Sequence, residues 1–172
     1  MVDDIEDPRR TEPAYISDER GMLEAWLEFH RLTLVLKCEG LDAEALRARP
    51  VETSMLSLHG LVRHMADVER NWFTRVLLKE PETPGLFFVD GLDDRELYPL
   101  DEADWSEDLA TWTKECDMSR EHATRFDLDH VGARRGKDVS LRWIYNHMIE
   151  EYARHNGHAD LIREMVDGAV GW

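Results

Sequence analysis

The sequence predicts an all-α fold, a four-helix bundle formed by a single domain. Four segments, each of about 20 residues or more, carry apolar side chains at intervals of three and four residues, as helices with one buried face do. No segment has the alternation of apolar and polar residues that would predict a convincing sheet. The 172 residues are enough to enclose one substantial hydrophobic core, and four helices of this length are typical of a bundle.

The first predicted helix runs from Ser17 to Gly40, a glycine in the place where helices commonly end. Residues 1–16 precede it; they are acidic and contain two prolines. They therefore predict an N-terminal tail in front of a bundle domain that spans residues 17–172.

The second predicted helix begins at Ser57, whose side chain can cap the first turn, and it ends before Pro81. The third runs from about Ser106 to Phe126, again with apolar residues on one side. Both helices have the length and the single apolar stripe that packing in a bundle requires.

The fourth predicted helix follows Ser140, a second serine cap, and ends at Asp167, where Gly168 follows. The least regular part of the chain is residues 81–103, which connect the second and third helices. A link of this length permits a crossover, so a simple up-down-up-down order is not assumed. Within it, residues 86–89 are expected to form a short strand or to pack over an opening, where they could be one wall of a pocket.

The composition limits the partners and the location. The 37 acidic and 21 basic residues give a net charge of −16, which argues against nucleic acid or an anionic membrane as the main partner. No apolar stretch approaches the roughly 20 residues that a membrane span needs, and the polar N-terminus lacks a secretory signal. Cys38 and Cys116 form no C-x-x-C motif, so a reduced, cytoplasmic protein is expected. A homodimer is compatible with a bundle, although no segment indicates an interface.

The fourth helix contains the stretch "HMIEEYARHNGH", residues 147–158, with three histidines and two glutamates. At 100° per residue, His155 lies in the middle of the apolar face, and Glu151 lies about 40° from it, one turn earlier. His158 and His147 flank them on the same side, at about 60° and 80°. Helical phase therefore predicts that Glu151 and His155 point inward.

A carboxylate that faces the core is costly unless it is paired or bound to a metal. Glu151 and His155 are either a hydrogen-bonded ion pair that needs no metal, or an i, i+4 pair of metal ligands. His64, at the edge of the apolar stripe of the second helix, adds a third potential ligand. The resulting His–Glu–His set leaves coordination positions open, as catalytic metal sites do, and it suits zinc or nickel. Glu69 lies within the stripe of the second helix and is a candidate partner of these ligands.

The remaining polar residues predict less. His59 is expected to be exposed on the opposite side of the second helix, and Asp67 is expected to face solvent. His30 points inward from the first helix, so a hydrogen-bonded core histidine is the first alternative and a contact with substrate is the second. Four tryptophans at helical spacing are expected to be core residues first and pocket walls second: Trp26, Trp72, Trp112 and Trp143.

Two segments, "SLHGLVRHMADVERNWF" and "LRWIYNHMIEEYARHNGHADLIREMVDG", resemble the signature helices of the DinB/YfiT-like superfamily. The first predicted helix fits the uncharacterised branch related to mycothiol-dependent enzymes, similar to the N-terminal domain of mycothiol-dependent maleylpyruvate isomerase. The resemblance implies an up-down-down-up bundle and a divalent metal held by His64, Glu151 and His155. Glutamate is the middle ligand, as in that isomerase, and His158 stands where the commoner members have glutamine, so it is an extra ligand or a neighbour of the ligands.

The resemblance also implies an activity. Characterised relatives are metal-dependent transferases or isomerases that use a low-molecular-weight thiol such as mycothiol or bacillithiol. An S-transferase that acts on a small electrophile is therefore the expected function, and a non-catalytic metal- or ligand-binding stress or detoxification protein is the alternative. The isomerase carries a further C-terminal domain and this sequence ends at Trp172, so isomerisation of maleylpyruvate is not expected. Arg154 and Arg163 are candidates for binding carboxylates of the cosubstrate.

Overall fold

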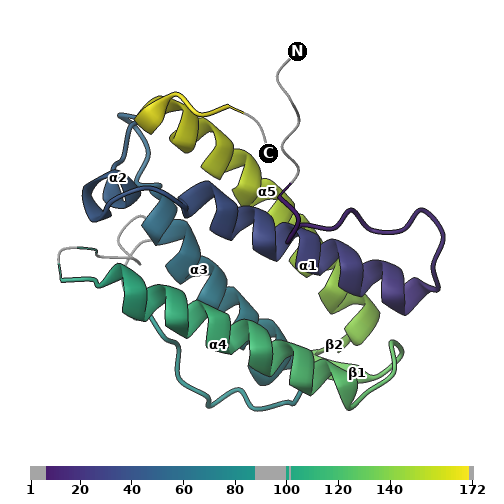
Figure 1. The fold of residues 1–172 in the computed structure, drawn as a ribbon. Coiled ribbons are helices and arrows are strands. Elements are labelled where there is room, and N and C mark those ends of the chain that lie inside the picture. The colour runs from purple at the N-terminus through teal and green to yellow at the C-terminus, as the bar shows by residue number, and fades with distance from the viewer. Residues whose placement is uncertain (1–6, 88–99, 101, 171–172) are drawn as a thin grey trace.

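Four long helices lie side by side in the computed structural model, which describes residues 7–87, 100 and 102–170 (Figure 1). The helices are α1 (Glu19–Cys38), α2 (Ala43–Arg47), α3 (Leu58–Arg70), the π-helical η1 (Asn71–Val76), α4 (Trp105–Thr124) and α5 (Leu141–Asp167), and the strands are β1 (Val131–Arg134) and β2 (Lys137–Ser140). The chain is therefore mostly helical, as predicted. Within the described ranges, no helix combines the length and the apolar character that a membrane crossing requires.

The ends of the long helices follow from their capping residues. Ser57 and Ser140 accept backbone N–H bonds at the starts of α3 and α5, as the sequence predicts. α1 and α4 begin at aspartate caps, Asp18 and Asp104, within two residues of the predicted starts. Gly168 ends α5 with a φ of 78°, a left-handed conformation that favours glycine.

α3 and α4 run in the same direction. Near their starts, His59 Nε2 lies 2.7 Å from Asp108 Oδ2, and near their ends Thr74 Oγ1 lies 3.3 Å from His122 Nδ1. The start of α3 thus lies beside the start of α4, and η1, which continues α3, lies beside the end of α4.

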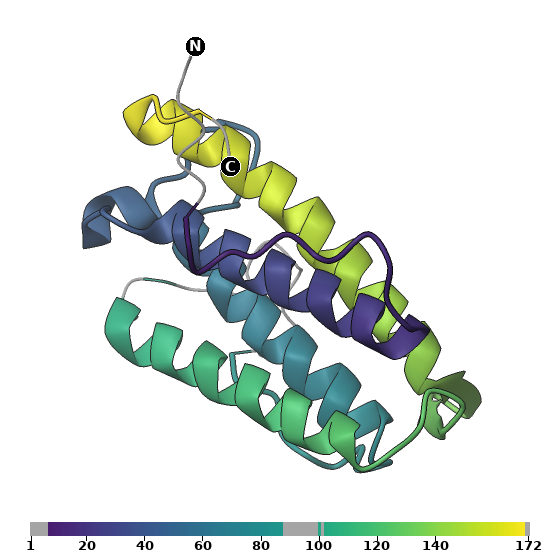
Figure 2. The same cartoon turned by 45° about the vertical axis from the view of Figure 1, so that its right-hand side comes forward.

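α1 and α5 also run alike, in the direction opposite to α3 and α4 (Figures 1 and 2). The Tyr145 hydroxyl donates to Glu24 near the starts of both helices, at 3.0 Å. Arg163 Nη1 donates to the carbonyl of Lys37 near their ends, also at 3.0 Å. The metal-ligand candidates on α3 and α5 therefore lie on helices that run past each other in opposite directions.

A small antiparallel hairpin, β1–β2, was not predicted, and neither was the short helix α2. Gly132 pairs with Val139, and the turn contains Arg135 and Gly136, both with positive φ, 49° and 76°. Two such residues form the type of turn that joins two strands tightly. With four residues in each strand, the hairpin is too short for its alternation to be recognised in the sequence.

The expectation that all four tryptophans are core residues is wrong for two of them. Trp72 and Trp112 are 2% and 6% exposed, but Trp26 and Trp143 are 37% and 47% exposed. Trp143 stacks on the ring of His147 instead, with centroids 4.9 Å apart. Helical spacing alone does not show where the neighbouring helices stop covering a side chain.

Substituting Gly132 with alanine is expected to destabilise the fold by about 1–3 kcal/mol, because overpacking strains a close-packed contact. A Cβ atom at this position would lie 2.4 Å from the carbonyl oxygen of Val76, the last residue of η1. It would also lie 3.0 Å from the Cα atom of Leu77, the residue that follows η1. Urea unfolding of the two proteins measures the difference. Gly157→Ala is the control, since its Cβ would meet nothing within 4 Å in the middle of α5 and should leave stability unchanged or raised. Equal stability of Gly132→Ala and wild type would contradict this packing.

Candidate metal centre

α3 and α5 bring His64, Glu151 and His155 together. One potential ligand atom from each lies within 4.8 Å of the other two, and all three side chains are half-buried. The imidazole rings of His64 and His155 have centroids 4.6 Å apart, and His155 Nε2 lies 3.6 Å from Glu151 Oε2. The i, i+4 spacing on α5 places Glu151 and His155 on the same side of the helix, and α3 presents His64 to them.

These three residues fit a divalent metal ion. Ligand bonds of about 2.0–2.1 Å in tetrahedral geometry separate ligand atoms by roughly 3.4 Å, so only small side-chain movements would bring the present atoms into place. Two imidazoles and one carboxylate suit zinc or nickel, and three protein ligands leave a position for a reactant.

His158 and His147 flank the three residues. His158 Nδ1 lies 3.3 Å from His155 Nδ1, which leaves the Nε2 atom of His155 facing Glu151. His147 Nε2 lies 3.2 Å from Glu151 Oε1, the carboxylate oxygen that does not face His155. Flanking groups of this kind fix the orientation of metal ligands and the tautomer of ligating histidines.

The pKa values of the site favour the forms that bind metals. Interaction with His155, together with the imidazoles of His147 and His64, holds the pKa of Glu151 below its usual value, against the opposing effect of burial. Burial lowers the pKa of His147 more than Glu151 and Glu150 raise it. Burial, and then the neighbouring His155, lower the pKa of His158. The directions of these shifts favour an ionised Glu151 beside neutral His147 and His158 rings.

The three residues line a pocket of about 520 Å³. Much of the remaining lining comes from residues 49–57, the segment between α2 and α3, with Leu61 of α3 and with Arg154 and His158 of α5. This volume is within the usual range for a small-molecule site. The sequence analysis did not identify residues 49–57, because a polar loop has no periodicity that would show where it folds.

A family model of mycothiol-S-transferases matches residues 22–168. The chain belongs to the mycothiol-S-transferase family. The matched residues include all three metal-ligand candidates. The match confirms the resemblance to the DinB/YfiT-like branch that is related to mycothiol-dependent enzymes. It also confirms the predictions of an enzyme, a transferase, and of a low-molecular-weight thiol as cosubstrate. No curated protein and no solved structure gave a significant match.

Glu69 is not a neighbour of the metal-ligand candidates in this transferase, so that expectation is wrong. Its side chain is fully buried and forms a bidentate ion pair with Arg31 of α1, at 2.8 and 2.6 Å. The Tyr152 hydroxyl donates to Glu69 Oε1 at 2.8 Å and accepts from Trp112 Nε1 at 3.0 Å. The helical phase of Glu69 was predicted correctly, but an arginine from α1 pairs with it on the inside.

The transferase uses His30 and Arg163 to join helices. His30 is half-buried, and its neighbour is Asn156 of α5, whose Nδ2 lies 3.4 Å from the ring nitrogen and 3.0 Å from the carbonyl oxygen of His30. Arg163 donates to the carbonyls of Lys37 and Glu39 at the end of α1, so its expected role in binding a cosubstrate carboxylate is wrong. Arg154 does line the pocket of the metal-ligand candidates, although it pairs with Glu150 on its own helix.

Two expectations for α3 are wrong. His59 is buried rather than exposed, because α4 covers that side of α3 and Asp108 meets the His59 ring. Burial lowers the pKa of His59, against the opposing effect of Asp108. Asp67 is half-buried rather than solvated, and its two oxygens accept the backbone N–H groups of Leu86 and Phe87.

The segment 86–89 does not form the expected wall of the pocket as far as it is described. Leu86 and Phe87 are not in the lining of the 520 Å³ pocket, and Phe87 packs under the guanidinium of Arg63 instead. Residues 88 and 89 lie outside the described part of the chain.

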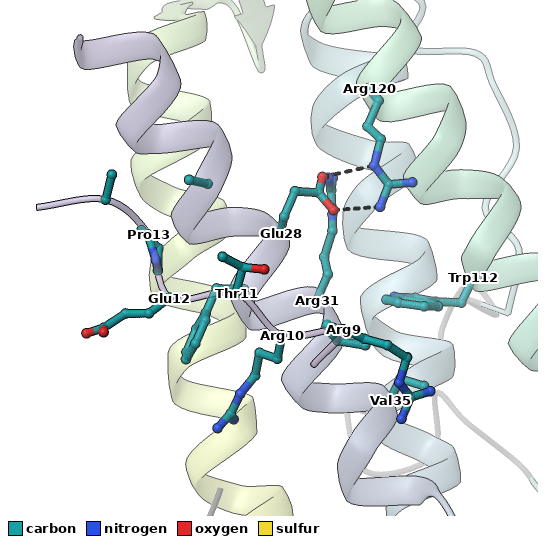
Figure 3. A pocket seen from close by; sticks show the side chains of 14 residues that line it. Arg9, Arg10, Thr11, Glu12, Pro13, Glu28, Arg31, Val35, Trp112 and Arg120 are labelled. Atoms are coloured by element: carbon teal, nitrogen blue, oxygen red, sulfur yellow. Dashed lines mark hydrogen bonds and ion pairs between the residues drawn. The ribbon is translucent and has the colours of Figure 1, made fainter. Parts of the chain in front are cut away.

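A second cavity, of about 610 Å³, lies between residues 9–14, α1 and α4 (Figure 3). Arginines line it, but Arg31 and Arg120 share the carboxylate of Glu28, at 2.6 and 2.7 Å, as Figure 3 shows for Arg120. Among the residues the structure describes, two groups of side chains could hold a metal ion: one is His64, Glu151 and His155, and the other is His147, Glu150 and Glu151. Neither group lines this cavity. The candidate metal centre of the transferase is therefore at the junction of α3 and α5.

Proposed function

We propose that the chain is a metal-dependent mycothiol S-transferase in which His64, Glu151 and His155 hold one divalent ion, zinc or nickel. The observation that carries the proposal is the convergence of three ligand atoms from two helices on the lining of a pocket of about 520 Å³. The alternative, a Glu151–His155 ion pair without a metal, explains neither the position of His64 beside them nor the pocket.

A bound divalent ion would supply a Lewis acid that favours the thiolate form of the cosubstrate. The protein supplies the rest. His158 and His147 hold the rings and the carboxylate of the three ligands in position, and the apolar side chains of Met55, Leu56 and Leu61 give the electrophile a surface away from water. In the reaction, the thiol loses its proton to solvent, a sulfur–carbon bond forms, and the bond between that carbon and the leaving group breaks, so that the leaving group departs with the electron pair.

The arrangement of the helices supports the rest of the proposal. α1 and α5 run one way and α3 and α4 the other, and in the sequence residues 81–103 connect α3 and its continuation η1 to α4, which fits a four-helix bundle in up-down-down-up order (Figure 1). The division into a tail, 1–16, and a bundle domain, 17–172, remains a prediction. So do the cytoplasmic location and a homodimer.

A conjugation assay tests the function. Wild-type protein loaded with zinc or nickel is expected to accelerate the reaction of mycothiol with monobromobimane above the uncatalysed rate, and chelation should remove the acceleration. A protein that binds metal stoichiometrically but consumes no mycothiol with any of several electrophiles would be a metal-binding protein instead.

His158→Ala is expected to weaken metal binding by about tenfold, because loss of a flanking hydrogen-bond partner typically costs 10–100-fold. The affected contact is the one between His158 Nδ1 and His155 Nδ1. Competition with a chromophoric zinc chelator measures the dissociation constant. His130→Ala is the control, because His130 stacks on Phe126 and belongs to neither group of potential metal ligands in the described chain. A loss of a thousandfold or more would show that His158 is itself a ligand.

A further inference from the structure

Arg49 lines the pocket of the metal-ligand candidates, and no carboxylate among the described residues lies within ion-pair distance of it. Its guanidinium packs against the loop that carries it, with Nη1 3.9 Å from the sulfur of Met55. Arg154, the other arginine in the lining, is already paired with Glu150. Of the two arginines in the described lining of this pocket, Arg49 is therefore the one without a carboxylate partner, and it can pair with an incoming anion.

The net negative charge of the whole chain makes a cation at position 49 important for binding an anion. At a net charge of −16, the protein surface as a whole repels anions, so an anionic reactant needs a local cation. Arginine binds carboxylates and similar planar anions through two parallel hydrogen bonds, which fixes the orientation of the ligand as well as its charge.

The surface beside Arg49 is apolar. Met55 is 42% exposed and lines the pocket, and Leu56 and the buried Leu61 continue the lining toward His64. The pocket thus offers three kinds of contact to a bound reactant: a cation on the loop, an apolar wall, and the metal-ligand candidates.

We infer that Arg49 is a specificity-determining residue and that the electrophile is an apolar molecule with an anionic group, such as a carboxylate. Its anionic group binds Arg49, its apolar body lies against Met55 and Leu56, and its reacting carbon lies toward His64 and His155. This inference rests on the proposed function for the reaction, but the recognition of the anion by Arg49 can be tested without turnover.

Two matched electrophiles test it: 4-(bromomethyl)benzoate and its neutral analogue 4-(bromomethyl)benzamide. In both, the mycothiol sulfur forms a bond to the benzylic carbon, the carbon–bromine bond breaks, bromide leaves with the electron pair, and the thiol proton passes to the buffer. Arg49→Gln is expected to raise KM for the benzoate by about tenfold, the loss of one charge-assisted contact, and to change KM for the benzamide less than twofold. The value of kcat should change little for either compound.

Arg135→Gln is the matched control, because it removes the same charge from an exposed hairpin turn that is not part of the pocket lining. It should leave the kinetics of both electrophiles unchanged. Equal effects of Arg49→Gln on the benzoate and the benzamide, or no effect on either, would overturn the inference.

Binding of 4-methylbenzoate and 4-methylbenzamide, measured by calorimetry on the metal-loaded protein, separates this inference from the proposed function. If wild-type protein transfers mycothiol to no electrophile, the proposed function fails, and the calorimetry still decides the role of Arg49. About tenfold weaker binding of 4-methylbenzoate to Arg49→Gln supports the inference. Binding that survives the substitution would mean that the carboxylate is held elsewhere in the pocket and would overturn it.

Discussion

Replacing His155 with alanine is expected to lower the rate of mycothiol transfer by about a hundredfold or more and to abolish stoichiometric metal binding. His155 is the residue on which the site converges: its Nε2 faces Glu151, its ring lies against that of His64, and its Nδ1 faces His158. Without it, two of the three ligands remain, too few for a zinc site of the usual kind. Turnover with monobromobimane and metal analysis of the same sample measure the two effects.

The fold should survive this substitution, because the His155 side chain is partly exposed, at 13%, and is not in the main apolar core. The melting temperature without added metal is therefore expected to stay close to that of wild type. His130→Ala is again the control and should retain both activity and metal. If His155→Ala lost its cooperative unfolding transition, the histidine would be structural, and a lower activity would no longer identify a ligand.

Substitution of Arg31 with methionine is expected to cost about 3–5 kcal/mol of stability, since breaking a buried ion pair leaves an uncompensated charge. Arg31 is 3% exposed, and its partner Glu69 is fully buried between α1, α4 and α5. Arg31 also joins Glu28, which pairs with Arg120 of α4, so the cation connects the inside of the bundle with its surface (Figure 3). Urea unfolding of the metal-free proteins measures the loss.

A double variant separates the ion pair from simple packing. Arg31→Met with Glu69→Gln removes both charges, so it should be less destabilised than the sum of the two single variants. Arg125→Ala, which breaks an exposed pair with Glu121, is the control and should cost about 0.5 kcal/mol or less. Additive single and double variants would contradict a coupled buried pair.

The sequence predicted the direction of side chains well where an apolar helical pattern extends over many residues. α5 has 27 residues, enough for its phase to separate inward from outward positions, and the structure brings Glu151 and His155 to the side that faces His64 of α3. Serine caps and the terminal glycine of α5 were equally readable, because each acts on the residues next to it.

Features that depend on a partner far away in the chain were not readable. The phase of Glu69 shows that it faces inward, but the choice of Arg31 as its partner, 38 residues earlier, depends on how α1 packs. His59 was expected to be exposed because it lies opposite the apolar stripe of α3, but α4 covers that side of the helix and buries it. The segment 49–57 has no periodic pattern, so its place beside the metal-ligand candidates follows only from the fold.

The metal content of wild-type protein, purified without a histidine tag and analysed by mass spectrometry, tests the central claim most directly. The candidate centre at His64, Glu151 and His155 predicts about one divalent ion per chain in wild type and almost none in Glu151→Ala or His155→Ala. Wild-type protein that binds no zinc or nickel, even after incubation with either ion, would contradict it.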